Sequence, residues 1–130
     1  MTGTPNRDRV RSLVHRYFDL HSRREWVALL EMFAPDVTLI HSVYPKSVGR
    51  DAVGRFFTDY IPSRFRQYFE YAPNVIVEGS WAAAEWIFEV TRLDGRAATL
   101  TGVTLLEFED ERIKTIKIFT DPEQLGSPTA

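Results

Sequence analysis

The stretch WAAAEWIFEVTRLDGRAATLTGVTLLEFE, residues 81–109, decides the fold class because it has the pattern of a β-hairpin. Its two arms are rich in β-branched and aromatic residues, which favour strands. In the first arm acidic and aromatic residues alternate, from Glu85-Trp86 to Phe88-Glu89, as in a strand with one polar and one apolar face. Asp94-Gly95 lies between the arms and is typical of a tight hairpin turn. The stretch therefore predicts two long antiparallel strands.

The strand pattern continues on both sides of this hairpin. Two further turn signals, Glu78-Gly79-Ser80 and Glu109-Asp110-Glu111, separate it from neighbouring runs of similar composition. We expect strands over 67–78, 81–92, 97–109 and 112–120. Because short turns join consecutive strands, the second half of the chain predicts an antiparallel meander.

The first half of the chain has helical periodicity instead. A first helix carries an apolar stripe at three- and four-residue spacing, formed by Val10, Leu13, Val14, Tyr17, Phe18 and His21. Thr4 followed by Pro5 supplies a cap and a first-turn proline for this helix. This spacing predicts a helix that buries one face.

A second, shorter helix follows directly. Ser22-Arg23-Arg24-Glu25 is a capping-box pattern, and apolar residues from Trp26 to Phe33 continue at helical spacing until Pro35 ends the helix. The remaining elements of this half are a short strand over 37–41 and a third helix over 52–61, which Pro62 stops. Helices first and a sheet afterwards predict an α+β fold with helices on one face of the sheet.

Composition narrows the class of protein. The 130 residues, 44% of them hydrophobic, are enough for one domain over 1–130, with a frayed tail at 126–130. A net charge of -2 argues against a nucleic-acid partner, and the absence of cysteine excludes disulfides and thiol chemistry. No apolar run suits a membrane span or a leader peptide, so we expect no membrane partner and a cytoplasmic location.

Four motifs spread over nearly the whole chain give it a family resemblance. They are the runs 14–18, 26–37, 48–57 and 112–121. Together with the order of elements, they resemble the nuclear transport factor 2-like superfamily, specifically its SnoaL-like and ketosteroid-isomerase-like small proteins. The resemblance implies a cone-shaped fold in which three helices and a strongly curved, mainly antiparallel sheet enclose a deep apolar pocket. It does not imply one reaction, because members include isomerases, dehydratases, polyketide cyclases, epoxide hydrolases and non-enzymatic binding proteins.

The resemblance also implies three catalytic candidates. Tyr17 matches the oxyanion tyrosine of ketosteroid isomerases, and His41 stands where those enzymes have a general-base aspartate. Asp121 matches the proposed base of SnoaL-like cyclases. The second oxyanion acid of ketosteroid isomerases falls near Val103 or Thr104, which cannot replace it. The Arg-x-Asp pair of epoxide hydrolases has no counterpart, so neither of those two activities transfers unchanged.

Each candidate also has a structural interpretation. His41 shares a strand face with two apolar residues and can exchange protons near neutral pH, or it is a hydrogen-bonded histidine at a strand end. Tyr17 can donate a hydrogen bond to a developing oxyanion, or it belongs to the core. Asp121 either points into the pocket as a base or orienting group, or it caps the end of a strand before Pro122.

The expected substrate-binding residues are mostly aromatic: Phe18, His21, Phe57, Tyr60, Trp86 and Phe88. No metal site is predicted, since histidines 15, 21 and 41 have no metal-ligand spacing, and no cofactor is expected because nucleotide-binding motifs are lacking. The main hypothesis is a cofactor-independent lyase or isomerase, polyketide cyclase-like or dehydratase-like, acting on a hydrophobic small molecule. The alternative is a non-catalytic binding or scaffold protein of the same fold. By family habit, we expect a homodimer formed through the outer face of the sheet.

Overall fold

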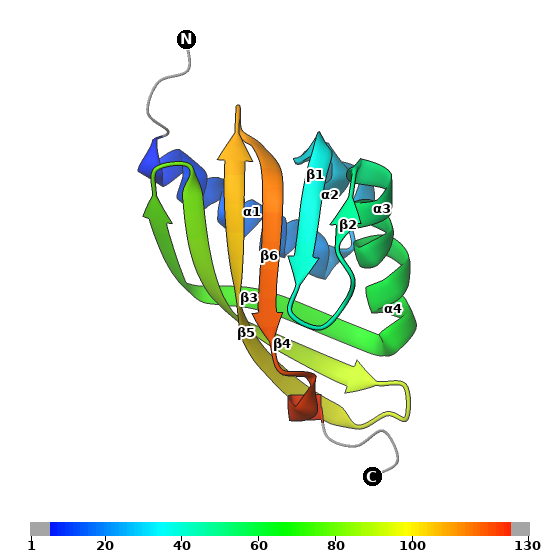
Figure 1. Ribbon diagram of the computed structural model, residues 1–130. Coiled ribbons are helices and arrows are strands. Elements are labelled where there is room, and N and C mark those ends of the chain that lie inside the picture. The colour runs from blue at the N-terminus through cyan, green and yellow to red at the C-terminus, as the bar shows by residue number, and fades with distance from the viewer. Residues whose placement is uncertain (1–5, 126–130) are drawn as a thin grey trace.

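One curved sheet of six strands forms the body of the protein, with helices packed against one of its faces (Figure 1). The computed structural model describes residues 6–125. The strands are β1 (Phe33–His41), β2 (Ser47–Val48), β3 (Phe65–Glu78), β4 (Trp81–Arg92), β5 (Ala97–Glu109) and β6 (Arg112–Thr120). Their order is β2-β1-β6-β5-β4-β3, and every neighbouring pair is antiparallel except β1 with β6. The predicted α+β class and the antiparallel meander of β3 to β6 are confirmed.

The first helix, α1 (Arg7–Arg23), is capped by a residue that the sequence reading passed over. The side chain of Asn6 accepts hydrogen bonds from the backbone N–H groups of Asp8 and Arg9. The predicted cap at Thr4 and Pro5 lies outside the described residues, as does the predicted tail at 126–130. The apolar stripe of α1 is buried, including Tyr17 and His21, which confirms the predicted helix with one buried face.

The second helix, α2 (Trp26–Glu31), is shorter than predicted. Phe33 begins β1 instead of ending the helix, and Pro35 lies inside that strand. The expected capping box does not form, because no side chain caps α2. Instead, the hydroxyl of Ser22 donates to the carbonyl of Glu70 and accepts from its N–H, at 2.7 and 2.8 Å. Long-range pairing with β3 has displaced the local cap.

The third helical segment continues past the proline that was expected to stop it. It consists of α3 (Arg50–Arg55), the π-helical turn η1 (Phe56–Tyr60) and α4 (Ile61–Arg64). A proline inside an α-helix removes a hydrogen bond and collides with the carbonyl four residues earlier. Here the N–H of Ile61 bonds to the carbonyl of Phe56, five residues back, so the wider π-turn accommodates Pro62.

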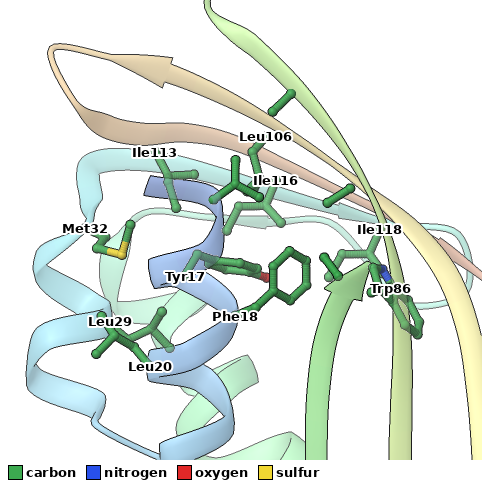
Figure 2. Close-up of a cluster of buried hydrophobic side chains, with 14 of the residues drawn as sticks. Tyr17, Phe18, Leu20, Leu29, Met32, Trp86, Leu106, Ile113, Ile116 and Ile118 are labelled. Atoms are coloured by element: carbon green, nitrogen blue, oxygen red, sulfur yellow. The ribbon is translucent and has the colours of Figure 1, made fainter. Parts of the chain in front are cut away.

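The hydrophobic core lies between α1, α2 and the covered face of the sheet. Figure 2 shows Tyr17 projecting from α1 within this cluster, with its hydroxyl on the side where Trp86 and Ile118 lie. A short 3₁₀ helix, η2 (Pro122–Leu125), follows β6. Among the described residues, no helix combines the length and apolar character that crossing a membrane requires.

Candidate active site

A cavity of about 80 Å³ lies between α1, the third helical segment and the covered face of the sheet. Many of the side chains in its wall are aromatic, including Phe57 from the π-turn and Phe88 from β4. The volume is small compared with the roughly 300–1,000 Å³ of pockets that bury drug-sized ligands. In this conformation the cavity suits a molecule with one ring better than a polycyclic one.

Most of the residues that the sequence singled out meet at this cavity. The lining includes Tyr17, His21, His41, Phe57, Tyr60, Trp86 and Phe88. Phe18 does not line it: its ring is buried in the core, edge-on to the ring of Tyr17 at 4.9 Å. The spacing of apolar residues in α1 correctly predicts that Phe18 is buried. It does not predict whether a buried residue of α1 faces the cavity or the core.

Asp121 also lies outside the cavity. Alternate side chains of a strand point to the same face of the sheet. In β6, Ile116 and Ile118 are buried on the face that the helices cover, and Thr120, on the same face, lines the cavity. Asp121 therefore falls on the opposite side, where its side chain is exposed and accepts a hydrogen bond from the backbone N–H of Glu123 at 2.9 Å. Asp121 therefore caps the end of β6 and does not point into the pocket as a base.

A buried histidine and a buried glutamate face each other in the cavity wall. His21 is only 1% exposed, and within residues 6–125 neither of its ring nitrogens has a hydrogen-bond partner. The nearest charge is the Oε1 atom of Glu70, 3.8 Å from His21 Nδ1, which is too far for a hydrogen bond. Buried polar atoms are rarely left unpaired, since doing so costs free energy. A polar group of a bound molecule could form a hydrogen bond with one of these two nitrogens.

The backbone of Glu70 is held in place from α1. The two hydrogen bonds of Ser22 to its N–H and carbonyl fix this part of β3 against the C-terminal end of the helix. The sequence reading missed Glu70 because both parities of this strand carry aromatic residues, such as Tyr68 and Phe69, so neither could be identified as the inner one. Only the tertiary contact with α1 assigns Glu70 to the cavity.

Tyr17 is suited to donate a hydrogen bond. Burial, reinforced by the negative charge of Glu70, raises the pKa of the Tyr17 phenol well above its usual value. The hydroxyl therefore stays protonated over the whole physiological range. Inside a cavity with little water, such a donor stabilises negative charge that develops on a ligand oxygen.

The environment of His41 favours a donor over a base. The backbone N–H of Val43 donates to His41 Nδ1 at 3.1 Å, which places the ring proton on Nε2. Burial lowers the pKa of His41 below its usual 6.5, so the ring is neutral at neutral pH. A neutral imidazole whose Nδ1 lone pair is occupied offers Nε2–H to a ligand. The role of general base, expected from the family position, does not suit this hydrogen bond.

Trp86 and Thr104 form a buried pair on the sheet side of the cavity. The indole N–H of Trp86 donates to the hydroxyl of Thr104 at 2.8 Å. The resemblance predicts that the second oxyanion acid of ketosteroid isomerases would fall near Thr104, whose hydroxyl is a neutral hydrogen-bonding group. The pair fixes the Trp86 ring against the cavity.

The mouth of the cavity is built from aromatic rings and one cation. The ring centres of His41 and Tyr44 are 4.5 Å apart, and those of Tyr44 and Tyr60 are 4.9 Å apart. Arg64, at the end of α4, donates from Nη1 to the hydroxyl of Tyr60 at 3.1 Å. Tyr44, Phe56 and Arg64 all line the cavity and were not among the predicted residues. Within residues 6–125, no three histidine or acidic side chains gather in a metal-binding cluster.

The fold and the cavity agree with a family match over most of the chain. Residues 14–116 match the model of the SnoaL-like domain family, and the chain belongs to that family. The chain matches no curated protein.

Solved structures share the fold at low sequence identity. One is a proposed polyketide cyclase of Xanthomonas campestris pv. campestris, with 22% identity, a TM-score of 0.79, and 93% of this chain and 96% of that chain covered. A second is an NTF2-like protein of unknown function from Burkholderia pseudomallei, with 23% identity, a TM-score of 0.82, and 90% and 94% covered. A third is a proposed ketosteroid isomerase of Kribbella flavida, with 23% identity, a TM-score of 0.73, and 88% and 78% covered. These likenesses establish the nuclear transport factor 2-like fold.

Proposed function

We propose that this protein is a cofactor-independent acid-base enzyme of the isomerase or lyase class that acts on a hydrophobic small molecule. The observation that carries the proposal is His21, buried in the cavity wall with both nitrogens unpaired and a carboxylate beside it. A few polar groups that converge in an otherwise apolar cavity are a common feature of ligand-binding and active sites. Similar folds described as a polyketide cyclase and as isomerases support the same class of reaction.

The proposed reaction begins with proton transfer from carbon. His21 Nε2 takes a proton from the carbon next to a ligand carbonyl, and the electrons of the broken C–H bond move onto the carbonyl oxygen. The negative charge of Glu70 stabilises the resulting imidazolium. Tyr17 and His41 donate hydrogen bonds to the enolate oxygen. Return of the proton to another carbon completes an isomerisation, and loss of a leaving group from the enolate completes an elimination.

Proton exchange tests this step without knowledge of the natural substrate. The α-hydrogens of cyclohexanone, a ketone with a single ring, exchange with deuterium in D₂O, and NMR measures the rate with and without protein. We expect the protein to accelerate exchange, and His21→Gln to lower this acceleration by about 10²- to 10⁴-fold. His15→Gln is the matched control, because His15 lies exposed on the same helix. Glu70→Gln should reduce the rate less than His21→Gln does.

Binding without exchange would favour the alternative function. If cyclohexanone and related one-ring ketones shift the melting temperature but exchange no faster than with the His21→Gln variant, the cavity serves a non-catalytic binding protein. His21 and Glu70 would then recognise a polar group of the ligand.

We further propose that two copies associate through the outer face of the sheet. Large apolar side chains are exposed on or beside this face, among them Phe69, Tyr71, Ile76 and Phe119. The strand register places Val103 of β5 opposite Phe119 and Ile87 of β4 opposite Tyr71, which extends the apolar surface across the sheet. Exposed apolar area of this kind favours association.

A further inference from the structure

Two unlike charges lie at two ends of the same cavity. The carboxylate of Glu70 is in the buried wall beside His21, and the guanidinium of Arg64 is at the mouth. Both residues belong to one continuous piece of chain, because α4 ends at Arg64 and β3 starts at Phe65. Arg64 and Glu70 form no salt bridge with each other.

Arg64 keeps donors free for a ligand. It donates a hydrogen bond of 3.1 Å to the hydroxyl of Tyr60, and its guanidinium lies 5.7 Å from the centre of that ring. No carboxylate among the described residues pairs with it. A guanidinium has five N–H donors in a planar fork that matches a carboxylate. The bond to Tyr60 holds the side chain at the mouth and leaves most of this fork unused.

The surroundings of Arg64 favour an anion. Arg64 borders both the cavity and a neighbouring surface hollow, which Arg92 and Asp94 also line. Asp94 is the acidic group of this hollow, and it already pairs with Arg96 at 2.8 Å and faces Arg92 at 3.9 Å. Its charge is therefore compensated, and the positive charge of Arg64 is not. A ligand acid meets attraction at the mouth and repulsion from Glu70 at the other end.

We propose that the ligand of this cavity is a carboxylic acid on a small apolar body, whose carboxylate binds Arg64 while its reactive end lies against His21 and Glu70. This inference rests on the proposed function in so far as it assigns the inner end to proton transfer. The small cavity limits the apolar body to about one ring. Arg64 thereby selects the substrate class and sets the direction in which the substrate enters.

A pair of isosteric probes tests the inference. 3-Phenylpropanoate and its neutral amide, 3-phenylpropanamide, have nearly the same shape, and their binding is followed by the fluorescence of the tryptophans, one of which, Trp86, lines the cavity. We expect the acid to bind about tenfold more tightly than the amide, with the preference shrinking at high salt. Arg64→Gln should remove the preference, and Arg64→Lys should keep part of it. Arg66→Gln is the matched control, because Arg66 is exposed and does not line the cavity.

The outcomes separate this inference from the proposed enzyme. Equal affinity for acid and amide, a preference that survives Arg64→Gln, or no binding of either compound at millimolar concentration would each overturn it. An acid preference lost in Arg64→Gln, together with ketone exchange that is unchanged in His21→Gln, would uphold the recognition of acids and reject the proposed catalysis. Exchange that depends on His21 without any acid preference would do the reverse.

Discussion

At the scale of single residues, one hydrogen bond changes the role of His41. The resemblance to ketosteroid isomerases predicts a base at its position on β1, yet the N–H of Val43, two residues later, occupies the Nδ1 lone pair. The pKa of His41 is also lowered by burial, which disfavours the imidazolium. A histidine in this environment is a neutral donor, and the base must come from elsewhere in the cavity.

This lowered pKa predicts a specific pH dependence of stability. The unfolded chain has a His41 pKa near 6.5 and the folded protein a lower one, so the unfolded state binds the proton first as pH falls. The contribution of His41 to stability is therefore complete above pH 6.5 and is lost as pH falls through the folded-state pKa. In His41→Asn, whose side-chain oxygen can still accept from Val43, urea unfolding should show a shallower loss of stability on acidification. Equal slopes for parent and variant would contradict the assignment.

The Trp86 and Thr104 pair yields a second prediction at this scale. Thr104→Val keeps the shape of the side chain but leaves the buried indole N–H without an acceptor. We expect it to lower the free energy of unfolding by about 1–3 kcal/mol, the cost of an unsatisfied buried donor. Thr104→Ser, which keeps the hydroxyl, serves as the control in the same urea titration. A Val variant as stable as the Ser variant would show that the hydrogen bond contributes nothing.

At the scale of elements, the π-turn η1 positions the cavity wall. It inserts one extra residue into a helical turn, which rotates the residues after it relative to those before it. As a result, Phe56, Phe57 and Tyr60 all line the cavity although they lie on one short segment. The sequence reading treated Pro62 as a helix end because a regular α-helix cannot accept it. The wider turn, which is closed by the hydrogen bond from the N–H of Ile61 to the carbonyl of Phe56, was not visible in the local pattern.

Two glycines offer a matched test of how strands and helices tolerate an added methyl group. A Cβ at Gly102 of β5 would collide with the ring of Trp86 and lie 2.5 Å from the carbonyl oxygen of Phe119, a backbone atom that cannot easily move. A Cβ at Gly54 of α3 would meet only the terminal methyl of Leu30, at 2.7 Å, and that side chain can rotate.

We therefore expect Gly102→Ala to destabilise the protein by about 1–3 kcal/mol, as overpacking does. Gly54→Ala should have a much smaller effect, because alanine is also favoured over glycine inside a helix by roughly 0.5–1 kcal/mol. Thermal unfolding of both variants measures the difference. The reverse order of stabilities would mean that the sheet relaxes around Trp86 more easily than its packing indicates.

At the scale of the whole molecule, the proposed dimer can be tested on side chains that the single chain leaves exposed. Phe119 is 47% exposed on the outer sheet face, and Val27 is 74% exposed on α2, away from that face. We expect the protein to sediment at twice the 15.0 kDa mass of the chain, and Phe119→Glu to shift it toward the monomer. Val27→Glu should leave the dimer intact. A protein that is monomeric at every concentration would reject this interface.

The sequence by itself determined the helices and strands that show a clear periodicity of apolar side chains. The strands over 81–92, 97–109 and 112–120 and the buried stripe of α1 follow from side-chain spacing, since a two-residue or 3.6-residue period is a property of neighbouring residues. For the same reason, most of the aromatic lining of the cavity could be predicted, and the SnoaL-like family could be inferred from local motifs.

The tertiary structure alone decided the chemistry of the cavity. Glu70 comes to His21 only because β3 packs against α1, and Asp121 points away because the register with β5 fixes which side of β6 is buried. The charge of Arg64 became significant only when α4 was placed at the mouth. These features depend on which distant segments meet, and a local pattern carries no information about that when both faces of a strand are apolar, as in β3.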